Sequence, residues 1–269
     1  MDQRLAILGT GNLGRAIANG LLNSGKYNPA KVTLTRRKLD LITDLRDKGF
    51  NIQQDNCSAV RNSEVIIIAV EPQQINQLLD EIKNDLDPEK HIIISVVTGV
   101  TISQIQKRLA DNIVVVRAMP NTAIAIQESM TCLASDNSNA QKVTQAIFNT
   151  VGTTLVIDEE SMTAATALGA CGIAFFLRAI RAASQGGIEI GFHSDKAMLI
   201  AAQTAKGAAS LLLKNDQHPE HEIDKVTTPR GVTISGLNQM EHEGFSSAMI
   251  KGIVTSWTKA SKLYVQNGE

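Results

Sequence analysis

Three glycines near the N-terminus constrain the fold of this chain more than any other feature. In the stretch "AILGTGNLGRAIANGLL", Gly9, Gly11 and Gly14 follow a short apolar run and open a segment with helical spacing. The first glycine of such a pattern makes a tight turn, the second lets the backbone approach a phosphate, and the third lets helix and strand pack closely. The helix start then points its free N–H groups at the anion. The sequence therefore predicts a βαβ unit that binds the pyrophosphate of a dinucleotide.

The N-terminal half of the chain repeats one order: a short β-branched run, a turn and an amphipathic stretch. The runs are "RLAILG", "KVTLT", "EVIIIAV", "HIIISVV", "NIVVVRAM", "TCLAS" and "TTLVI". The middle runs are apolar throughout, which is typical of parallel strands whose two faces are both covered by helices. We therefore expect a Rossmann-like, doubly wound α/β sheet over residues 1–158.

The remaining residues, 159–269, follow a different pattern. The β-branched runs stop, and alanine- and leucine-rich segments with helical spacing take their place. Several of these segments, such as "AFFLRAI" and "AAQTAKGAASLLL", are apolar on more than one face. Because such helices need a partner to cover them, the sequence predicts a second, all-helical domain that forms a homodimer.

Composition and charge exclude several classes of protein. The chain is 43% hydrophobic and 20% charged, and its net charge of -1 gives no reason to expect nucleic acid or a membrane as partner. The cysteines, Cys57, Cys132 and Cys171, are scattered, so we expect small buried side chains, no metal site and a cytoplasmic location. The runs "VIIIAV" and "IIISVV" are much shorter than the roughly 18 residues of a membrane span, and no signal peptide is apparent.

The end of the second predicted strand bears on the choice of cofactor. A fold that binds NAD offers an acidic residue there to the ribose 2′-hydroxyl. This chain has Thr35, Arg36, Arg37 and Lys38 instead. A hydroxyl and two guanidinium groups suit a 2′-phosphate, because arginine binds phosphate through paired donors. NADPH is therefore favoured over NADH, although a solvated basic turn is a competing interpretation for Lys38 and for one arginine.

Five stretches together resemble one family. They are "GTGNLG", "SVVTGVTI", "RAMPNTA", the pair His218–Pro219, and the segment "VTTPRGVTISGLNQMEHEGF" at residues 226–245, which is the most specific. In order and spacing they resemble pyrroline-5-carboxylate reductase over essentially the whole chain. The resemblance implies NADPH-dependent reduction of 1-pyrroline-5-carboxylate, a small cyclic imine, to L-proline, the last step of proline biosynthesis. It also implies a homodimer through the helical domain, with a decamer of dimers as the larger assembly.

The resemblance also assigns residues to the site. It implies that the substrate binds at Asn121 and at a loop formed by Thr228, Arg230, Gly231, Val232 and Thr233. The family's threonine that matches Thr233 lies beside the ring nitrogen. An imine accepts hydride best when its nitrogen is hydrogen-bonded, so Thr233 is the candidate catalytic residue, either as a donor or as an orienting group. The implied cofactor contacts are Gly9, Thr10, Gly11, Asn12, Leu13, Gly14, Thr35, Arg36, Arg37, Asn56, Ala69, Val70, Glu71, Pro72, Ser95, Val96, Val97, Met119, Pro120 and Asn121.

Five positions depart from the family pattern. Glu71 replaces a lysine, Ala123 and Ile173 each replace a proline, Phe175 replaces a tyrosine, and Arg230 replaces a second glycine. Arg230 can reach the substrate carboxylate, crowd a glycine-sized place or point to solvent. The departures keep two alternatives open. One is a related NADPH-dependent oxidoreductase for another imine or for a β-hydroxy acid, with a lysine such as the one at position 196 or 206 as acid–base; the other is a non-catalytic NADPH-binding regulator.

Overall fold

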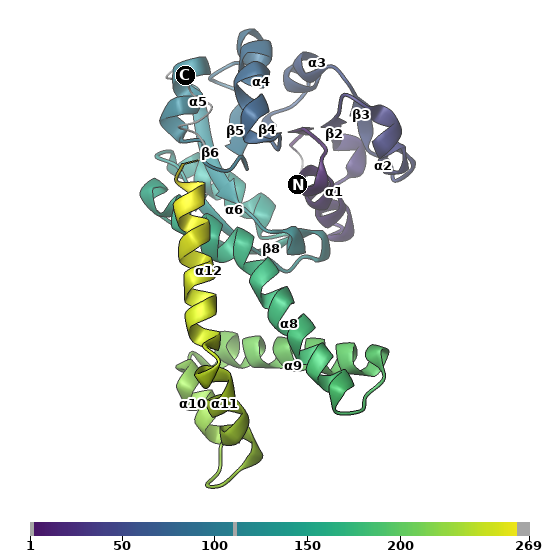
Figure 1. The fold of residues 1–269 in the computed structure, drawn as a ribbon. Helices are drawn as coiled ribbons and strands as arrows, with labels where there is room; N and C mark the ends of the chain where they lie inside the picture. The colour runs from purple at the N-terminus through teal and green to yellow at the C-terminus, as the bar shows by residue number, and fades with distance from the viewer. Residues whose placement is uncertain (1–2, 110–111, 263–269) are drawn as a thin grey trace. The chain divides into compact units, whose positions relative to one another are not determined.

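The chain folds into two compact units. A computed structural model describes residues 3–109 and 112–262 of the 269-residue chain, and Figure 1 shows its fold. The first unit runs to Cys171 and takes up the chain again from Ser256, and the second is Gly172–Thr255. The last strand ends at Val156 and the helical segment begins at Glu159, so the change of secondary structure precedes the division into units.

The first unit is built on an eight-stranded sheet in the order β3-β2-β1-β4-β5-β6-β7-β8. Its strands are β1 (Leu5–Leu8), β2 (Val32–Thr35), β3 (Asn51–Gln53), β4 (Val65–Ile68), β5 (Ile92–Ser95), β6 (Val114–Met119), β7 (Ser129–Ala134) and β8 (Gly152–Val156). All neighbouring pairs from β3 to β6 are parallel, so their carboxyl ends meet at one edge. This confirms the doubly wound sheet, whose winding reverses between β1 and β4, where such folds bind ligands.

Helices α1 to α6 lie between the strands along the chain, and α7 follows the last strand. They are α1 (Asn12–Asn23), α2 (Thr43–Asp47), α3 (Asn56–Arg61), α4 (Ile75–Ile82), α5 (Ile102–Leu109), α6 (Ser138–Phe148) and α7 (Met162–Ala165). A glycine with a left-handed backbone follows each of the first two helices: Gly25 has φ 66° and Gly49 has φ 94°. Glycine adopts this left-handed conformation without a Cβ penalty, so helices commonly end there.

Both faces of the sheet are buried, which explains why its strands are apolar throughout. On one face, Leu5 and Ile7 of β1 belong to a cluster with apolar residues of α1, α2 and α6. On the other face, Ala6 and Leu8 belong to a cluster with apolar residues of α3, α4 and α5. Successive side chains of a strand point to opposite faces, so a strand between two helical layers requires an apolar residue at every position.

Two features of the sheet escaped the sequence-based prediction. The strand β3 has three residues, of which only Ile52 is apolar, so it carries no strand pattern. The strand β7 runs antiparallel to β6, because the chain returns through the short 3₁₀ segment Thr122–Ile126 instead of a crossover helix. Antiparallel neighbours can be joined by so short a connection, whereas parallel neighbours cannot.

The second unit is all-helical. Its helices are α8 (Gly172–Glu189), α9 (Ser194–Asn215), α10 (Pro219–Val226), α11 (Val232–His242) and most of α12 (Phe245–Ala260). Within Gly172–Thr255, all of which is described, the buried residues are Gly172, Ser184 and Ala197. Large apolar side chains are exposed instead, such as Phe176 at 61% and Leu199 at 70%. A single copy of this unit therefore leaves apolar surface uncovered, which marks an interaction site.

One helical stretch of the described chain, Glu159–Glu189, is long and apolar enough to cross a membrane, judged by length and composition alone. Only 17% of its most apolar window is buried. The expectation that the chain has no membrane span rested on the short strand runs, and this stretch lies outside them. Its apolar surface must meet either lipid or protein, because contiguous apolar patches are costly in water.

Candidate dinucleotide cleft and substrate loop

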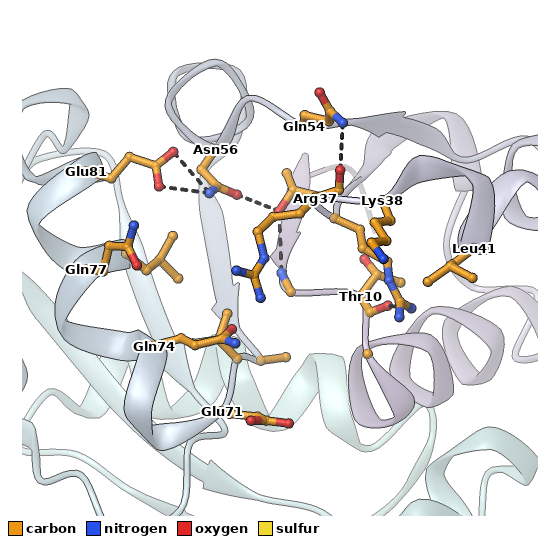
Figure 2. A pocket seen from close by; sticks show the side chains of 17 residues that line it. Thr10, Arg37, Lys38, Leu41, Gln54, Asn56, Glu71, Gln74, Gln77 and Glu81 are labelled. Atoms are coloured by element: carbon orange, nitrogen blue, oxygen red, sulfur yellow. Dashed lines mark hydrogen bonds between the residues drawn. The ribbon is translucent and has the colours of Figure 1, made fainter. Parts of the chain in front are cut away.

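A cleft of about 600 Å³ opens at the carboxyl ends of β1, β2 and β4 in the first unit. This is the edge at which a doubly wound sheet binds ligands. Figure 2 shows its side chains, which come from the glycine loop, the end of β2, the start of α3 and one face of α4. The lining residues are Gly9, Thr10, Gly11, Thr35, Arg36, Arg37, Lys38, Leu41, Gln54, Asn56, Ala69, Val70, Glu71, Gln74, Gln77, Leu78 and Glu81.

The glycine loop has the geometry that a pyrophosphate requires. Gly9 has φ 95°, and a Cβ there would lie 2.7 Å from Val70 Cγ1. A Cβ on Gly14 would collide with the carbonyl oxygen of Gly9, whereas a Cβ on Gly11 would meet nothing within 4 Å, so the loop is open on that side. No side chain caps the start of α1, and the buried hydroxyl of Thr10 has no partner among the described residues. Uncapped N–H groups and an orphan hydroxyl fit a bound phosphate.

A basic corner lies next to this loop, as the sequence predicted. Arg36 Nη1 donates a hydrogen bond to the carbonyl oxygen of Thr10 over 2.6 Å, which fixes the guanidinium beside the glycine loop. Gln54 Nε2 donates to the carbonyl oxygen of Arg37 over 2.6 Å and holds the turn after β2. Arg37 and Lys38 are exposed and line the cleft. Their positive charges suit a phosphorylated ribose.

A series of hydrogen bonds links the glycine loop and the end of β2 to the helices α3 and α4. The backbone N–H of Gly9 donates to Thr35 Oγ1 over 3.4 Å, and the Thr35 hydroxyl donates to Asn56 Oδ1 over 2.6 Å. Asn56 Nδ2 in turn donates to both carboxylate oxygens of Glu81, at 3.1 and 3.2 Å. An acidic side chain from α4 thus reaches the cofactor corner, where the end of β2 has no acid.

The cleft brings together half of the predicted cofactor residues. These are Gly9, Thr10, Gly11, Thr35, Arg36, Arg37, Asn56, Ala69, Val70 and Glu71. The others do not line it: Asn12, Leu13, Gly14, Pro72, Ser95, Val96, Val97, Met119, Pro120 and Asn121. The cofactor contacts of both groups stay predictions. In the second group, Asn121 lies in the loop after β6, and its Nδ2 donates to the carbonyl oxygen of Gly169, in the π-helical segment Thr166–Cys171, over 3.2 Å.

Several lining residues were not predicted. Lys38 and Gln54 come from the segments that follow β2 and β3, and Leu41 comes from the 3₁₀ helix Leu39–Ile42. Four more come from α4 and the residue before it: Gln74, Gln77, Leu78 and Glu81. The last four have the spacing i, i+3, i+4 and i+7, which places them on one face of a helix. The spacing was readable in the sequence, but nothing there said that this face borders the cofactor.

The predicted substrate loop belongs to the second unit and forms a tight turn. The N–H of Gly231 donates to the carbonyl oxygen of Thr228 over 2.8 Å, and Arg230 takes φ 60° at the third position of the turn. With proline at the second position this resembles a type II turn, whose third residue is normally glycine. A Cβ on Gly231 would lie 2.5 Å from Thr228 Oγ1, so that position also needs glycine. The positive φ at position 230 therefore explains why the family has a glycine there. In this chain, Arg230 adopts a conformation that is strained for a residue with a side chain.

The helix α11 begins directly after this turn. Gly231 is its N-cap and no side chain caps it, so the first N–H groups of the helix lack a side-chain acceptor. Val232 is exposed and Thr233, one residue further, is half-buried. Such a helix start favours a small anion, such as a carboxylate, and Thr233 places a hydroxyl within its first turn.

Comparison with known proteins shows the family to which this chain belongs. Residues 159–263 match the family model "Pyrroline-5-carboxylate reductase dimerisation", and residues 4–99 match "NADP oxidoreductase coenzyme F420-dependent". Pyrroline-5-carboxylate reductase 2 of Dictyostelium discoideum is 52% identical over 97% of this chain and 93% of its own length. The chain belongs to the pyrroline-5-carboxylate reductase family. Pyrroline-5-carboxylate reductase 1 of the same organism is 54% identical over 98% of this chain, which spans 50% of that relative's length.

A solved structure of the pyrroline-5-carboxylate reductase family matches the fold of the whole chain. It is the pyrroline carboxylate reductase of Plasmodium falciparum with NADP bound, which is 25% identical, covers 98% of each chain and has a TM-score of 0.90. The family thus accounts for both units, the sheet with its glycine loop and the helical segment.

Proposed function

We propose that this chain reduces 1-pyrroline-5-carboxylate to L-proline, with NADPH as the favoured hydride donor and NADH as the less favoured one. The observation that carries the proposal is the 52% identity with a pyrroline-5-carboxylate reductase along 97% of the chain. The cleft supports it independently, because its glycine loop, uncapped helix start and orphan Thr10 hydroxyl fit a dinucleotide. When bound, the nicotinamide would supply the hydride.

The protein's own contribution is to bind and orient. The loop from Gly9 to Gly14 and the N-terminus of α1 hold the pyrophosphate, and Arg36, Arg37 and Lys38 bind the 2′-phosphate. The start of α11 holds the carboxylate of the substrate, and the Thr233 hydroxyl hydrogen-bonds the ring nitrogen, so that negative charge does not build up there as hydride arrives. A protonated imine from solution would need no strong acid, which leaves Thr233 an orienting role.

The apolar surface of the helical segment supports a homodimer, and a decamer of dimers is the larger assembly we propose. Residues 159–263 match a dimerisation model, and the exposed apolar side chains lie in this segment. The same argument favours a second copy of the chain over lipid as the cover of Glu159–Glu189. The cytoplasmic location stays a prediction from the scattered cysteines.

The direct test mixes the purified full-length chain with NADPH and pyrroline-5-carboxylate and follows the loss of nicotinamide absorbance. We expect turnover with this imine and none with β-hydroxy acids. Turnover of a β-hydroxy acid or of another imine only would favour the related oxidoreductase. Bound NADPH without turnover of any of these substrates would favour the regulatory protein.

Thr233→Ala tests the role of the hydroxyl. We expect kcat to fall about ten- to a hundredfold while the affinity for NADPH is unchanged, since one catalytic hydrogen bond is lost. Ser235→Ala is the matched control, because the Ser235 hydroxyl donates to the carbonyl oxygen of Gly231 in the same helical turn. An unchanged kcat in Thr233→Ala would remove this residue from the mechanism.

A further inference from the structure

We propose that Glu81 sets the preference of the cleft between NADPH and NADH, by opposing the 2′-phosphate that the basic corner attracts. The proposal rests on the proposed dinucleotide site. The end of β2 carries no acidic residue, and for that reason the sequence favoured NADPH. The fold supplies a carboxylate to the same corner from α4, and both Glu81 and Arg37 line the cleft. Figure 2 shows Glu81 and Asn56 next to each other on one side of this cleft, joined by their hydrogen bonds.

The hydrogen bonds to Glu81 fix how the corner presents its polar groups. Because Nδ2 of Asn56 donates to both oxygens of Glu81, its Oδ1 is turned toward Thr35 and accepts that hydroxyl proton at 2.6 Å. Thr35 Oγ1 then faces the N–H of Gly9 as an acceptor. The Thr35 hydroxyl proton and the Asn56 side-chain amide are thus both engaged in hydrogen bonds within the protein. Neither group is therefore available to a phosphate.

The position of Glu81 is itself held from a second side. The thiol of Cys57, on the first turn of α3, donates to the backbone carbonyl oxygen of Glu81 over 3.2 Å. Burial, together with the nearby carboxylates, raises the pKa of the Cys57 thiol to about 11, so it keeps its proton at neutral pH and remains a donor. The C-terminal end of α4 is therefore tied to α3 through both the backbone and the side chain of Glu81.

This arrangement treats the two cofactors differently. A free ribose 2′-hydroxyl is a donor, and a carboxylate acceptor suits it. A 2′-phosphate carries negative charge and its oxygens are acceptors, so it is repelled by Glu81. Arg37 and Lys38, in contrast, attract the 2′-phosphate. One N–H of Arg36 already donates to the carbonyl oxygen of Thr10. The preference for NADPH is the balance of these opposed charges.

The experiment measures dissociation constants of NADP⁺ and NAD⁺ for the full-length chain by titration calorimetry. Glu81→Gln removes the charge but keeps an oxygen that can accept from Asn56, and Glu81→Ala removes both. Asp80→Asn is the matched control, because it removes an equal charge from the neighbouring residue, which lies outside the cleft and pairs with Arg108. The fragments 2′,5′-ADP and 5′-AMP repeat the comparison without the nicotinamide.

We expect Glu81→Gln to strengthen NADP⁺ binding relative to NAD⁺ by about three- to tenfold, an effect that salt weakens because the charges are exposed. Asp80→Asn should leave the ratio unchanged, and Arg36→Ala with Arg37→Ala should move it toward NAD⁺. An unchanged or lower ratio in Glu81→Gln overturns the role of Glu81. A fall in NADP⁺ binding in both Glu81 variants would show that Glu81 only positions Asn56. If the unaltered chain binds neither dinucleotide, the proposed function itself fails.

Discussion

The two units of the chain differ in how many of their apolar side chains are buried within a single copy. In the first unit every residue of β1 and β4 is buried, and apolar clusters fill both faces of the sheet. In the second unit three residues are buried, and apolar side chains such as Leu199 are exposed. A unit with a core of its own can fold from one chain, whereas a unit without one gains its burial by association. The first unit thus has a core of its own, whereas the second leaves apolar surface that the proposed dimer would cover.

Leu199→Glu tests this difference most severely. The side chain of Leu199 on α9 is 70% exposed. We expect the proposed dimer to cover it, and a charge there would then be buried without a partner. We expect association to weaken by roughly a hundredfold or more, measured by sedimentation at several protein concentrations. Leu41→Glu, in the first unit, is the control, because Leu41 is 48% exposed and should leave the molecular mass unchanged. A mass unaltered by Leu199→Glu would contradict the division between the units.

Glu159→Ala tests how far the first unit holds itself together. The Glu159 carboxylate accepts a hydrogen bond from Nη1 of the buried Arg117 at 3.1 Å and caps α5 through the N–H of Ile102 at 2.7 Å. Its removal leaves a buried guanidinium without this acceptor, so we expect a loss of about 2 kcal/mol in the free energy of unfolding by urea. Glu160→Ala, at the exposed neighbouring position, should cost little. Equal effects of the two variants would show that the pair contributes nothing specific.

Arg230→Gly tests the strained turn of the second unit. Arg230 has φ 60°, a conformation that costs a residue with a side chain about 1 kcal/mol more than glycine. Urea unfolding should therefore show a gain of about that size in Arg230→Gly, and no gain in Arg230→Ala, which keeps the Cβ. The KM for the imine tests whether Arg230 also binds the substrate. It rises in both variants if the guanidinium binds the carboxylate, and it stays constant if the side chain points to solvent.

Tyr27→Phe has the smallest expected effect and sharpens the account of the first core. Tyr27 is buried, and its hydroxyl has no partner among the described residues. Burial raises the pKa of Tyr27 to about 12 from about 10 in an unfolded chain. Because the folded pKa is the higher one, ionisation of Tyr27 does not lower the free energy of unfolding below about pH 10, and lowers it as the pH rises from about 10 toward 12.

We expect Tyr27→Phe to be neutral or slightly stabilising at neutral pH, by about 0.5 kcal/mol, because an unpaired buried hydroxyl is removed. The variant should also lose less stability than the unaltered chain between pH 10 and 12, measured by urea unfolding at each pH. Identical pH profiles for the two proteins would show that the hydroxyl is paired or ionises freely.

The fold was predictable where local sequence fixes local structure. Runs such as "VIII" in β4 are apolar at every position because two helical layers cover them, and the glycines that end α1 and α2 adopt left-handed angles. The direction of β7 was not predictable in this way. It depends on the length of one connection, and the same strand pattern fits either direction.

The candidate site divides in a similar way. The glycine loop and the basic turn after β2 were readable, because each is a continuous motif with its own chemistry. Glu81 was not, since its role depends on the packing of α4 beside α3, which brings residues 56 and 81 together. Arg230 is a third case: its position in the motif was visible, but the reason for a glycine there is the positive φ of the turn.

The central claim is that this chain transfers a hydride from the nicotinamide to the imine carbon of pyrroline-5-carboxylate. The most direct measurement uses NADPH that carries deuterium at the transferred position of the nicotinamide, and analyses the product by mass spectrometry and NMR. We predict proline that carries deuterium on the former imine carbon, in amounts equal to the NADPH oxidised. Unlabelled proline, or bound NADPH with no proline formed, would contradict the claim.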